Sequence, residues 1–138
     1  MKVYLVAGEP SGDKLGAELM AGLKSCAPYE LEFCGVGGPL MEEQGLTSLF
    51  PISEIAVMGI GEILAKYSFL KKRIKNTVDD ILRLKPDVLI TIDAPEFSLR
   101  VAKMVRKKIF INTIHYVAPT VWAWRPNRAK KISSYVDH

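Results

Sequence analysis

Two carboxylates that could take part in catalysis each follow a short apolar run that predicts a buried strand. Glu9 comes two residues after the run at 3–7, and Asp93 directly follows the run at 88–92. His115 is the last residue of another predicted strand, at 109–115. In open α/β sheets, ligands bind outside the carboxyl ends of the strands. We therefore expect the residues after these strands to form one site.

The turn at residues 8–13 reads Gly-Glu-Pro-Ser-Gly-Asp. Its glycines let the backbone approach a ligand closely, and the helix that follows presents unpaired amides. The turn is not a P-loop, because Asp13 stands where that motif needs lysine, and it is not a Gly-x-Gly-x-x-Gly fingerprint. A helix capped by Ser11 or Asp13 explains most of the turn. That explanation leaves Glu9 without a role.

Asp93 precedes Ala94-Pro95 and so lies at the tip of a strand in a rigid turn. Partial burial raises the pKa of a carboxyl group, which suits a general base. An aspartate that bonds to the amides of its own turn explains the position equally well. His115 is a base, a hydrogen-bond donor or a satisfied core histidine. Trp122 and Trp124, between two prolines, either stack on a sugar or pin their loop to the core.

The elements that must position these residues alternate between strand and helix. Strands are predicted at residues 3–7, 31–36, 47–50, 88–92 and 109–115, and helices from about 11, at 40–44, 61–84, 97–108 and 125–135. This order favours an α/β fold, a doubly wound, Rossmann-like parallel sheet. The alternation predicts a further strand after the last helix. We therefore expect residues 1–138 to be one domain of a longer fold.

The longest predicted helix carries an apolar stripe that should face the sheet; its members are Ile60, Ile63, Leu64, Tyr67, Leu70, Ile74, Val78, Ile81 and Leu82. Phe69 falls off this stripe, near Lys66, Lys72 and Arg73. An exposed aromatic ring among basic residues is typical of a contact with an anionic membrane surface. A solvated charged face with one stray phenylalanine is the alternative.

Composition limits the classes of protein to which this chain could belong. The chain is 49% hydrophobic and 25% charged, with a net charge of +4, which permits an anionic partner without identifying it. No apolar run is long enough to span a membrane, and the first residues do not form a signal peptide, so we expect a cytoplasmic protein. Cys26 and Cys34 show no metal-binding or redox spacing and are predicted to be small buried residues. We predict no metal and no cofactor.

Several motifs occur in an order and spacing that resemble the lipid-A-disaccharide synthase family. They are VAGEPSGD at 6–13, AVMG at 56–59, KPD at 85–87, IDAPEF at 92–97, HYV at 115–117 and VWAWR at 121–125. The resemblance covers essentially the whole chain. Departures are small: Glu96 stands where aspartate is usual, and Ala118 and Thr120 replace serines.

The resemblance implies a two-domain, B-type glycosyltransferase that needs no metal and works at the inner membrane. Such an enzyme joins UDP-2,3-diacylglucosamine to 2,3-diacylglucosamine 1-phosphate, releases UDP and inverts the anomeric centre. Asp93 matches the proposed catalytic carboxylate, and Glu9 and Ser11 match the amino-terminal active-site motif. We expect the substrate to contact Gly8, Gly12, Asp13, His115 and Trp124. The carboxyl-terminal half that holds the nucleotide-sugar is expected to be missing.

Two rival functions remain open from the sequence. The first is a truncated, inactive relic that binds only acceptor lipid or the membrane surface. The second is a nucleotide-binding domain of the flavodoxin type, which would require a tightly bound flavin or NAD. No feature points to nucleic acid as a partner.

Overall fold

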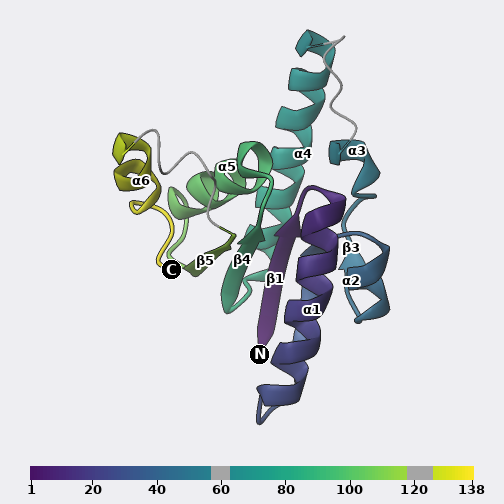
Figure 1. The fold of residues 1–138 in the computed structure, drawn as a ribbon. Helices are drawn as coiled ribbons and strands as arrows, with labels where there is room; N and C mark the ends of the chain where they lie inside the picture. Colours follow the sequence, from purple (N-terminus) through teal and green to yellow (C-terminus); the bar gives the residue numbers. More distant parts are fainter. Residues whose placement is uncertain (57–62, 118–125) are drawn as a thin grey trace.

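The computed structural model describes residues 1–56, 63–117 and 126–138. Its elements, in chain order, are β1 (Lys2–Ala7), α1 (Pro10–Cys26), β2 (Glu32–Val36), α2 (Pro39–Glu43), β3 (Thr47–Ser48), α3 (Ser53–Ala56), α4 (Ile63–Leu84), β4 (Val88–Ile92), α5 (Pro95–Arg106), β5 (Asn112–Tyr116) and α6 (Pro126–Ile132). The predicted alternation is confirmed (Figure 1). The prediction missed the one-turn helix α3, which is too short for a periodic apolar pattern to reveal.

The strands of the described residues form one parallel sheet in the order β3-β2-β1-β4-β5. The chain winds outward from β1 through β2 to β3, then returns to the other side of β1 to add β4 and β5. The winding direction therefore reverses between β1 and β4. This topological switch point is where ligands bind in doubly wound sheets.

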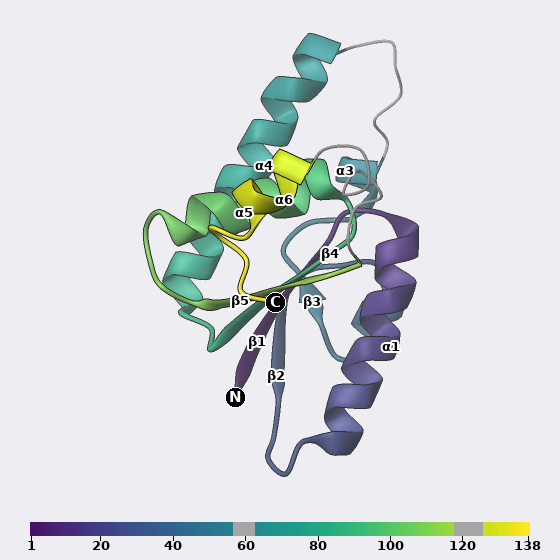
Figure 2. The same cartoon turned by 60° about the vertical axis from the view of Figure 1, so that its left-hand side comes forward.

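Helices cover both faces of the sheet, as the buried, mostly apolar strands β1 and β4 at its centre require. Leu5 and Ile90 pack with α1 and α2 on one face. Tyr4 and Leu89 pack with α4 and α5 on the other. Figure 2 shows α1 on one side of the strands and α4 and α5 on the opposite side. Because the strands are covered on both faces, only their ends remain accessible for a site.

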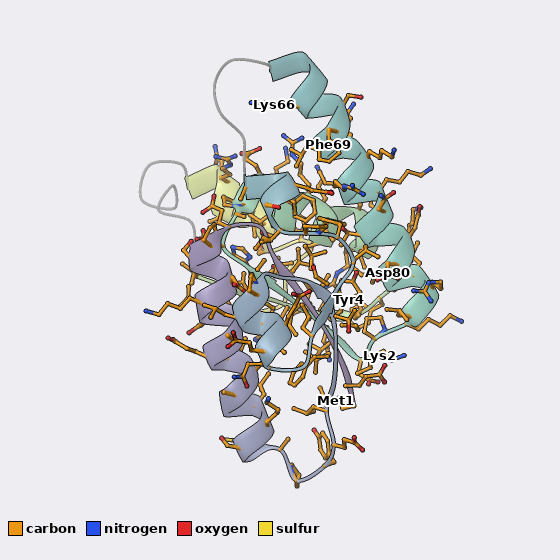
Figure 3. All side chains as sticks on the ribbon, turned by 90° about the vertical axis from the view of Figure 1, so that its right-hand side faces the viewer. Met1, Lys2, Tyr4, Lys66, Phe69 and Asp80 are labelled. Carbon is orange, nitrogen blue, oxygen red and sulfur yellow. The ribbon has the colours of Figure 1, made fainter. Side chains whose placement is uncertain are left out.

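A buried polar contact fixes α4 to the central strand. The Tyr4 side chain is fully buried, and its hydroxyl donates a hydrogen bond of 2.8 Å to Asp80 of α4. Burial and the neighbouring Asp80 carboxylate both raise the pKa of Tyr4 far above its usual value. Figure 3 shows Tyr4 and Asp80 side by side, with Lys66 and Phe69 towards the other end of α4.

The first turns of α4 extend beyond the sheet (Figure 1), and this corrects one prediction. Tyr67 belongs to the stripe that is predicted to be buried, but it is 45% exposed. The helical period is right, because Leu70, Ile74 and Val78 of the same stripe are buried. The Tyr67 ring instead contacts the charged groups of Lys71 on α4 and Arg100 on α5. No helix in the described part of the chain is long and apolar enough to cross a bilayer.

Residues 137 and 138 run alongside β5. The amides of Asp137 and His138 donate to the carbonyl oxygen of Thr113, and the amide of His115 donates to the carbonyl oxygen of His138. This is the hydrogen-bond pattern of a parallel pair, so chain after α6 begins to pair at the outer edge of β5. The Asp137 carboxylate also accepts a hydrogen bond from the Thr113 amide and pairs with Arg106.

The predicted burial of both cysteines is wrong for one of them. Cys26 is the last residue of α1 and is exposed. Cys34 lies in β2 and is half-buried, and burial raises its pKa to about 11. A raised pKa keeps the thiol protonated at neutral pH, which suits a structural rather than a reactive cysteine.

Candidate functional site

The turn between β1 and α1 presents Glu9 at the switch point. Glu9 has an extended backbone (φ −142°), and Pro10 starts the helix, a position where its missing amide costs nothing. The prediction that Ser11 or Asp13 caps this helix is wrong, because no side chain caps it. The Glu9 side chain is exposed and lines a pocket beside the turn.

The turn between β4 and α5 holds Asp93 in an unusual backbone conformation. Asp93 (φ +48°) and Ala94 (φ +42°) are consecutive left-handed residues that are not glycine. Such residues cost about 1–3 kcal/mol each and persist only where the surroundings hold them. Here the Asp93 amide donates a hydrogen bond to the backbone carbonyl oxygen of Tyr116. The Ser98 hydroxyl donates to the carbonyl oxygens of Asp93 and Ala94.

The two turns touch each other. A Cβ atom added at Gly8 would lie 2.6 Å from the Cβ of Ala94, so only glycine allows this approach. The Ser11 hydroxyl donates a hydrogen bond of 3.1 Å to the Asp93 carboxylate, although the two residues are 82 positions apart. The structure thus brings together Glu9, Ser11 and Asp93 as the sequence predicted. The half-buried Asp93 carboxylate can accept a proton, and Ser11 fixes one of its oxygens.

A pocket of about 330 Å³ opens beside these turns. Glu9 and Glu96 contribute carboxylates to its lining, and Ile55, Leu70 and Phe97 contribute apolar side chains. Phe97 is itself held by an edge-to-face contact with Phe50. A mostly apolar cavity with a few convergent polar groups is the usual form of a site for a small molecule.

His115 lies on β5 in register with Thr91 of β4. Its Nδ1 is 2.8 Å from the Thr91 hydroxyl, and its Nε2 is buried with no partner among the described residues. Burial lowers the pKa of His115, and the nearby Asp93 carboxylate partly opposes this effect. The imidazole is therefore neutral at pH 7, with Thr91 on one nitrogen and the other nitrogen without a described partner.

Asp13 has a structural role in place of the predicted contact with substrate. It is only 4% exposed, and its carboxylate accepts hydrogen bonds from the amides of Gly38, Leu40 and Met41 at 2.9–3.1 Å. These amides lie at the start of α2, where no intrahelical partner exists. Gly12 is also buried and packs against Ala7 of β1. We therefore leave both residues out of the proposed site.

The structure removes one residue, Arg73, from the predicted membrane contact. Phe69 is 39% exposed, and Lys72 is exposed. Arg73 forms an ion pair with Glu54 of α3 at 2.5 Å, and its guanidinium stacks on the rings of Phe50 and Phe69. Arg73 thus fastens α3 to α4 and is not available as a surface charge. Lys66 also interacts with a neighbour.

Four more residues bear on the site: Trp122, Trp124, Ser98 and Thr91. Trp122 and Trp124 lie outside the described residues. Ser98 contacts the backbone of Asp93, and Thr91 contacts His115; neither residue was predicted from the sequence. A polar residue inside an apolar strand was the available signal for Thr91, because such a residue needs a buried partner. Ser98, in the first turn of a helix after proline, carried no distinguishing signal.

Comparison with known proteins gives consistent matches. Residues 3–138 match the family model described as lipid-A-disaccharide synthetase. The chain is 55% identical over 138 residues to a lipid-A-disaccharide synthase of Ruegeria pomeroyi, covering all of this chain and 34% of the relative. It is 49% identical to those of Rhodospirillum centenum and Pseudomonas fluorescens, over 99% of this chain and 34% and 36% of the relatives. The chain thus spans about a third of the length of these proteins.

A solved structure supports the fold class alone. The chain superimposes on a UDP-GlcNAc 2-epimerase from Neisseria meningitidis bound to UDP-GlcNAc with a TM-score of 0.58 and 14% identity. The match covers 97% of this chain and 38% of the epimerase chain.

Proposed function

The chain belongs to the lipid-A-disaccharide synthase family, and from this premise we propose that it is the acceptor-side domain of an inverting glycosyltransferase. The proposed reaction joins UDP-2,3-diacylglucosamine to 2,3-diacylglucosamine 1-phosphate and releases UDP. The observation that carries the proposal is the contact between Ser11 and Asp93 at the switch point, beside the pocket lined by Glu9.

Asp93 is the proposed general base. Inversion needs a single displacement, in which the acceptor hydroxyl attacks the anomeric carbon and loses its proton. The bond from that carbon to UDP breaks, and the carboxylate takes the proton. Base assistance of this kind contributes about 10²–10⁴ in rate. The strained turn supports the assignment, because such backbone is often found where a side chain must be held in position.

The other groups have supporting roles in the proposal. Ser11 orients the Asp93 carboxylate, and Glu9, Gly8 and the apolar pocket contact the acceptor sugar. His115 is a neutral group near Asp93 in the proposal, held by Thr91 at Nδ1 and with a buried Nε2. The UDP portion would bind to a carboxyl-terminal half, which accounts for the rest of the length of the relatives. Transfer by this chain would then need that half, and no cofactor.

The test is a transferase assay with this chain alone and after addition of a carboxyl-terminal half. In the complete enzyme, Asp93→Asn should lower turnover by at least about 10²-fold with little change in acceptor binding. Asparagine tolerates the left-handed conformation that Asp93 adopts, so the turn should survive. Glu43→Gln, which neutralises an exposed carboxylate on α2, is the control. Near-normal turnover in Asp93→Asn would remove it from the mechanism.

The donor site is tested separately by calorimetry. We expect the isolated chain to bind UDP weakly or not at all, because none of its turns matches a phosphate-binding fingerprint. Stoichiometric binding at micromolar concentration would place the donor on this half. Acceptor or lipid binding without transfer, even with the second half present, would favour the inactive relic.

We also propose that the domain lies at the cytoplasmic surface of the inner membrane. Phe69 and Lys72 are exposed on α4, and Lys66 lies on the same part of the helix. Phe69→Ser with Lys72→Glu should weaken sedimentation with anionic vesicles. Unchanged sedimentation would leave this part of α4 as an ordinary solvated surface.

A further inference from the structure

Two arginines converge on one carboxylate at the edge of the pocket beside the switch point. Glu96 lies in the first turn of α5 and lines the pocket of about 330 Å³. One of its carboxylate oxygens accepts a hydrogen bond of 3.0 Å from Arg100, one turn further along α5. The other oxygen accepts a hydrogen bond of 3.5 Å from Arg128 of α6. Two helices thus direct guanidinium groups to one point beside the proposed site.

The two ion pairs of Glu96 are exposed and therefore contribute little to the stability of the fold. The side chain of Glu96 is 65% exposed, and those of Arg100 and Arg128 are 42% and 45% exposed. Water screens such pairs and competes for their hydrogen bonds. The pair between Arg106 and Asp137 is less exposed, at 17% and 31%, and fastens the end of the chain to β5. Glu96 is thus held loosely enough to be exchanged for another anion.

A phosphate group would bind both arginines more strongly than the Glu96 carboxylate does. The planar guanidinium group presents a fixed fork of N–H donors that matches the oxygens of phosphate. A phosphate monoester offers three terminal oxygens and a charge of about −1.5 to −2 at pH 7, whereas a carboxylate offers two oxygens and a single charge. Arg100 is also restrained by Tyr67, because its guanidinium lies 5.7 Å from the centre of that ring.

The two arginines lie close to the turn that holds the proposed base. Ala94, Pro95 and Glu96 line the pocket, and Asp93 directly precedes them. Helix α6 lies beside α5, so Arg128 reaches this turn from a separate element (Figure 2). A sugar phosphate in the pocket would therefore present a hydroxyl group to Asp93 and its phosphate to the arginines.

We propose that Arg100 and Arg128 bind the phosphate monoester of a sugar phosphate, and that Glu96 holds the two arginines until this ligand displaces it. The inference rests on the proposed function, in which the acceptor carries a 1-phosphate. Glu96 competes with the ligand for the same donors, so its charge lowers the affinity for phosphate. No covalent bond forms or breaks in this exchange.

The test is a titration of this chain with glucosamine 1-phosphate, followed by nuclear magnetic resonance chemical shifts. Arg100→Gln and Arg128→Gln should each raise the Kd about fivefold to tenfold, because each removes a charge-assisted hydrogen bond to the phosphate. Glu96→Gln should lower the Kd by at least about threefold, because it removes the competing charge. The matched controls are Arg83→Gln, from an exposed pair in the last turn of α4, and Glu43→Gln on α2. Both controls should leave the Kd nearly unchanged.

The direction of the Glu96→Gln effect separates ligand binding from a purely structural role. If Glu96 only fastened α6 to α5, its substitution would leave the Kd unchanged or raise it, and that result would overturn the proposal. Equal affinity for glucosamine, which lacks the phosphate, would also overturn it, as would no binding of glucosamine 1-phosphate at millimolar concentration. UDP binding that is stronger and is lost in both arginine variants would assign the arginines to the donor instead.

A failure of this proposal can be distinguished from a failure of the proposed function. In the complete enzyme, Arg100→Gln and Arg128→Gln should raise the KM for the acceptor with little change in kcat, whereas Asp93→Asn should lower kcat. Normal turnover in Asp93→Asn, together with weakened phosphate binding in the arginine variants, would reject the base and retain the phosphate site. Thermal denaturation checks that each variant remains folded.

Discussion

Replacing Asp13 by asparagine should destabilise the fold, although the two side chains have nearly the same shape. One carboxylate oxygen accepts the amides of Gly38 and Met41 at 2.9 and 3.0 Å, and the other accepts the amide of Leu40 at 3.1 Å. Asparagine has one oxygen and one NH₂ group. In either orientation the NH₂ group therefore faces at least one backbone donor, and that donor loses its partner.

The expected loss in the free energy of unfolding follows from the number of hydrogen bonds that the substitution removes. Losing one hydrogen bond to a charged group costs about 1.5–3 kcal/mol, and the two retained bonds lose their charge assistance. Asp13→Asn should lower the free energy of unfolding by about 2–3 kcal/mol. Asp13→Ala removes all three bonds at a site that is 4% exposed, so its cost should exceed about 4 kcal/mol.

Urea denaturation followed by far-UV circular dichroism measures both variants. Glu42→Gln is the matched control, because it removes an exposed carboxylate from the first turn of the same helix, α2. Glu42→Gln removes only a favourable interaction with the dipole of α2, so the free energy of unfolding should fall by less than about 0.5 kcal/mol. If Asp13→Asn costs no more than Glu42→Gln, the carboxylate does not hold the start of α2.

Three further predictions concern the core and the switch point. Tyr4→Phe removes a buried hydroxyl that donates to a carboxylate of α4, and denaturation should show a loss of about 1.5–3 kcal/mol; no loss would contradict the assigned contact. Gly8→Ala should cost about 1–3 kcal/mol, because its Cβ would lie 2.6 Å from that of Ala94, whereas Gly22→Ala in open space on α1 should stabilise the fold. Burial lowers the pKa of His115, so the unfolded chain takes up its proton first, and stability should fall as pH drops below about 6.5. His115→Asn should flatten that fall in denaturation series from pH 8 to pH 5, and an unchanged slope would refute the role of this histidine.

The order of strands and helices could be predicted from the sequence, because each element carries a local signal. The run at 88–92 is apolar throughout and is a strand, and the leucines and isoleucines of α4 repeat at helical spacing. The grouping of Glu9, Ser11 and Asp93 at one edge was also predictable. In a parallel sheet with crossover helices, the carboxyl ends of all strands meet at the same edge.

The sequence could not decide which polar residue serves the site and which serves the fold. Ser11 and Asp13 are two positions apart on the same helix, yet Ser11 meets Asp93 across the switch point and Asp13 meets the start of α2. Their directions differ because the helical turn separates neighbouring side chains by about 100°. In the same way, Arg73 of the basic patch pairs with Glu54 of α3, and Tyr67 of the apolar stripe stays exposed beside the charged groups of Lys71 and Arg100. These outcomes depend on contacts between elements far apart in the chain, which only the tertiary structure brings together.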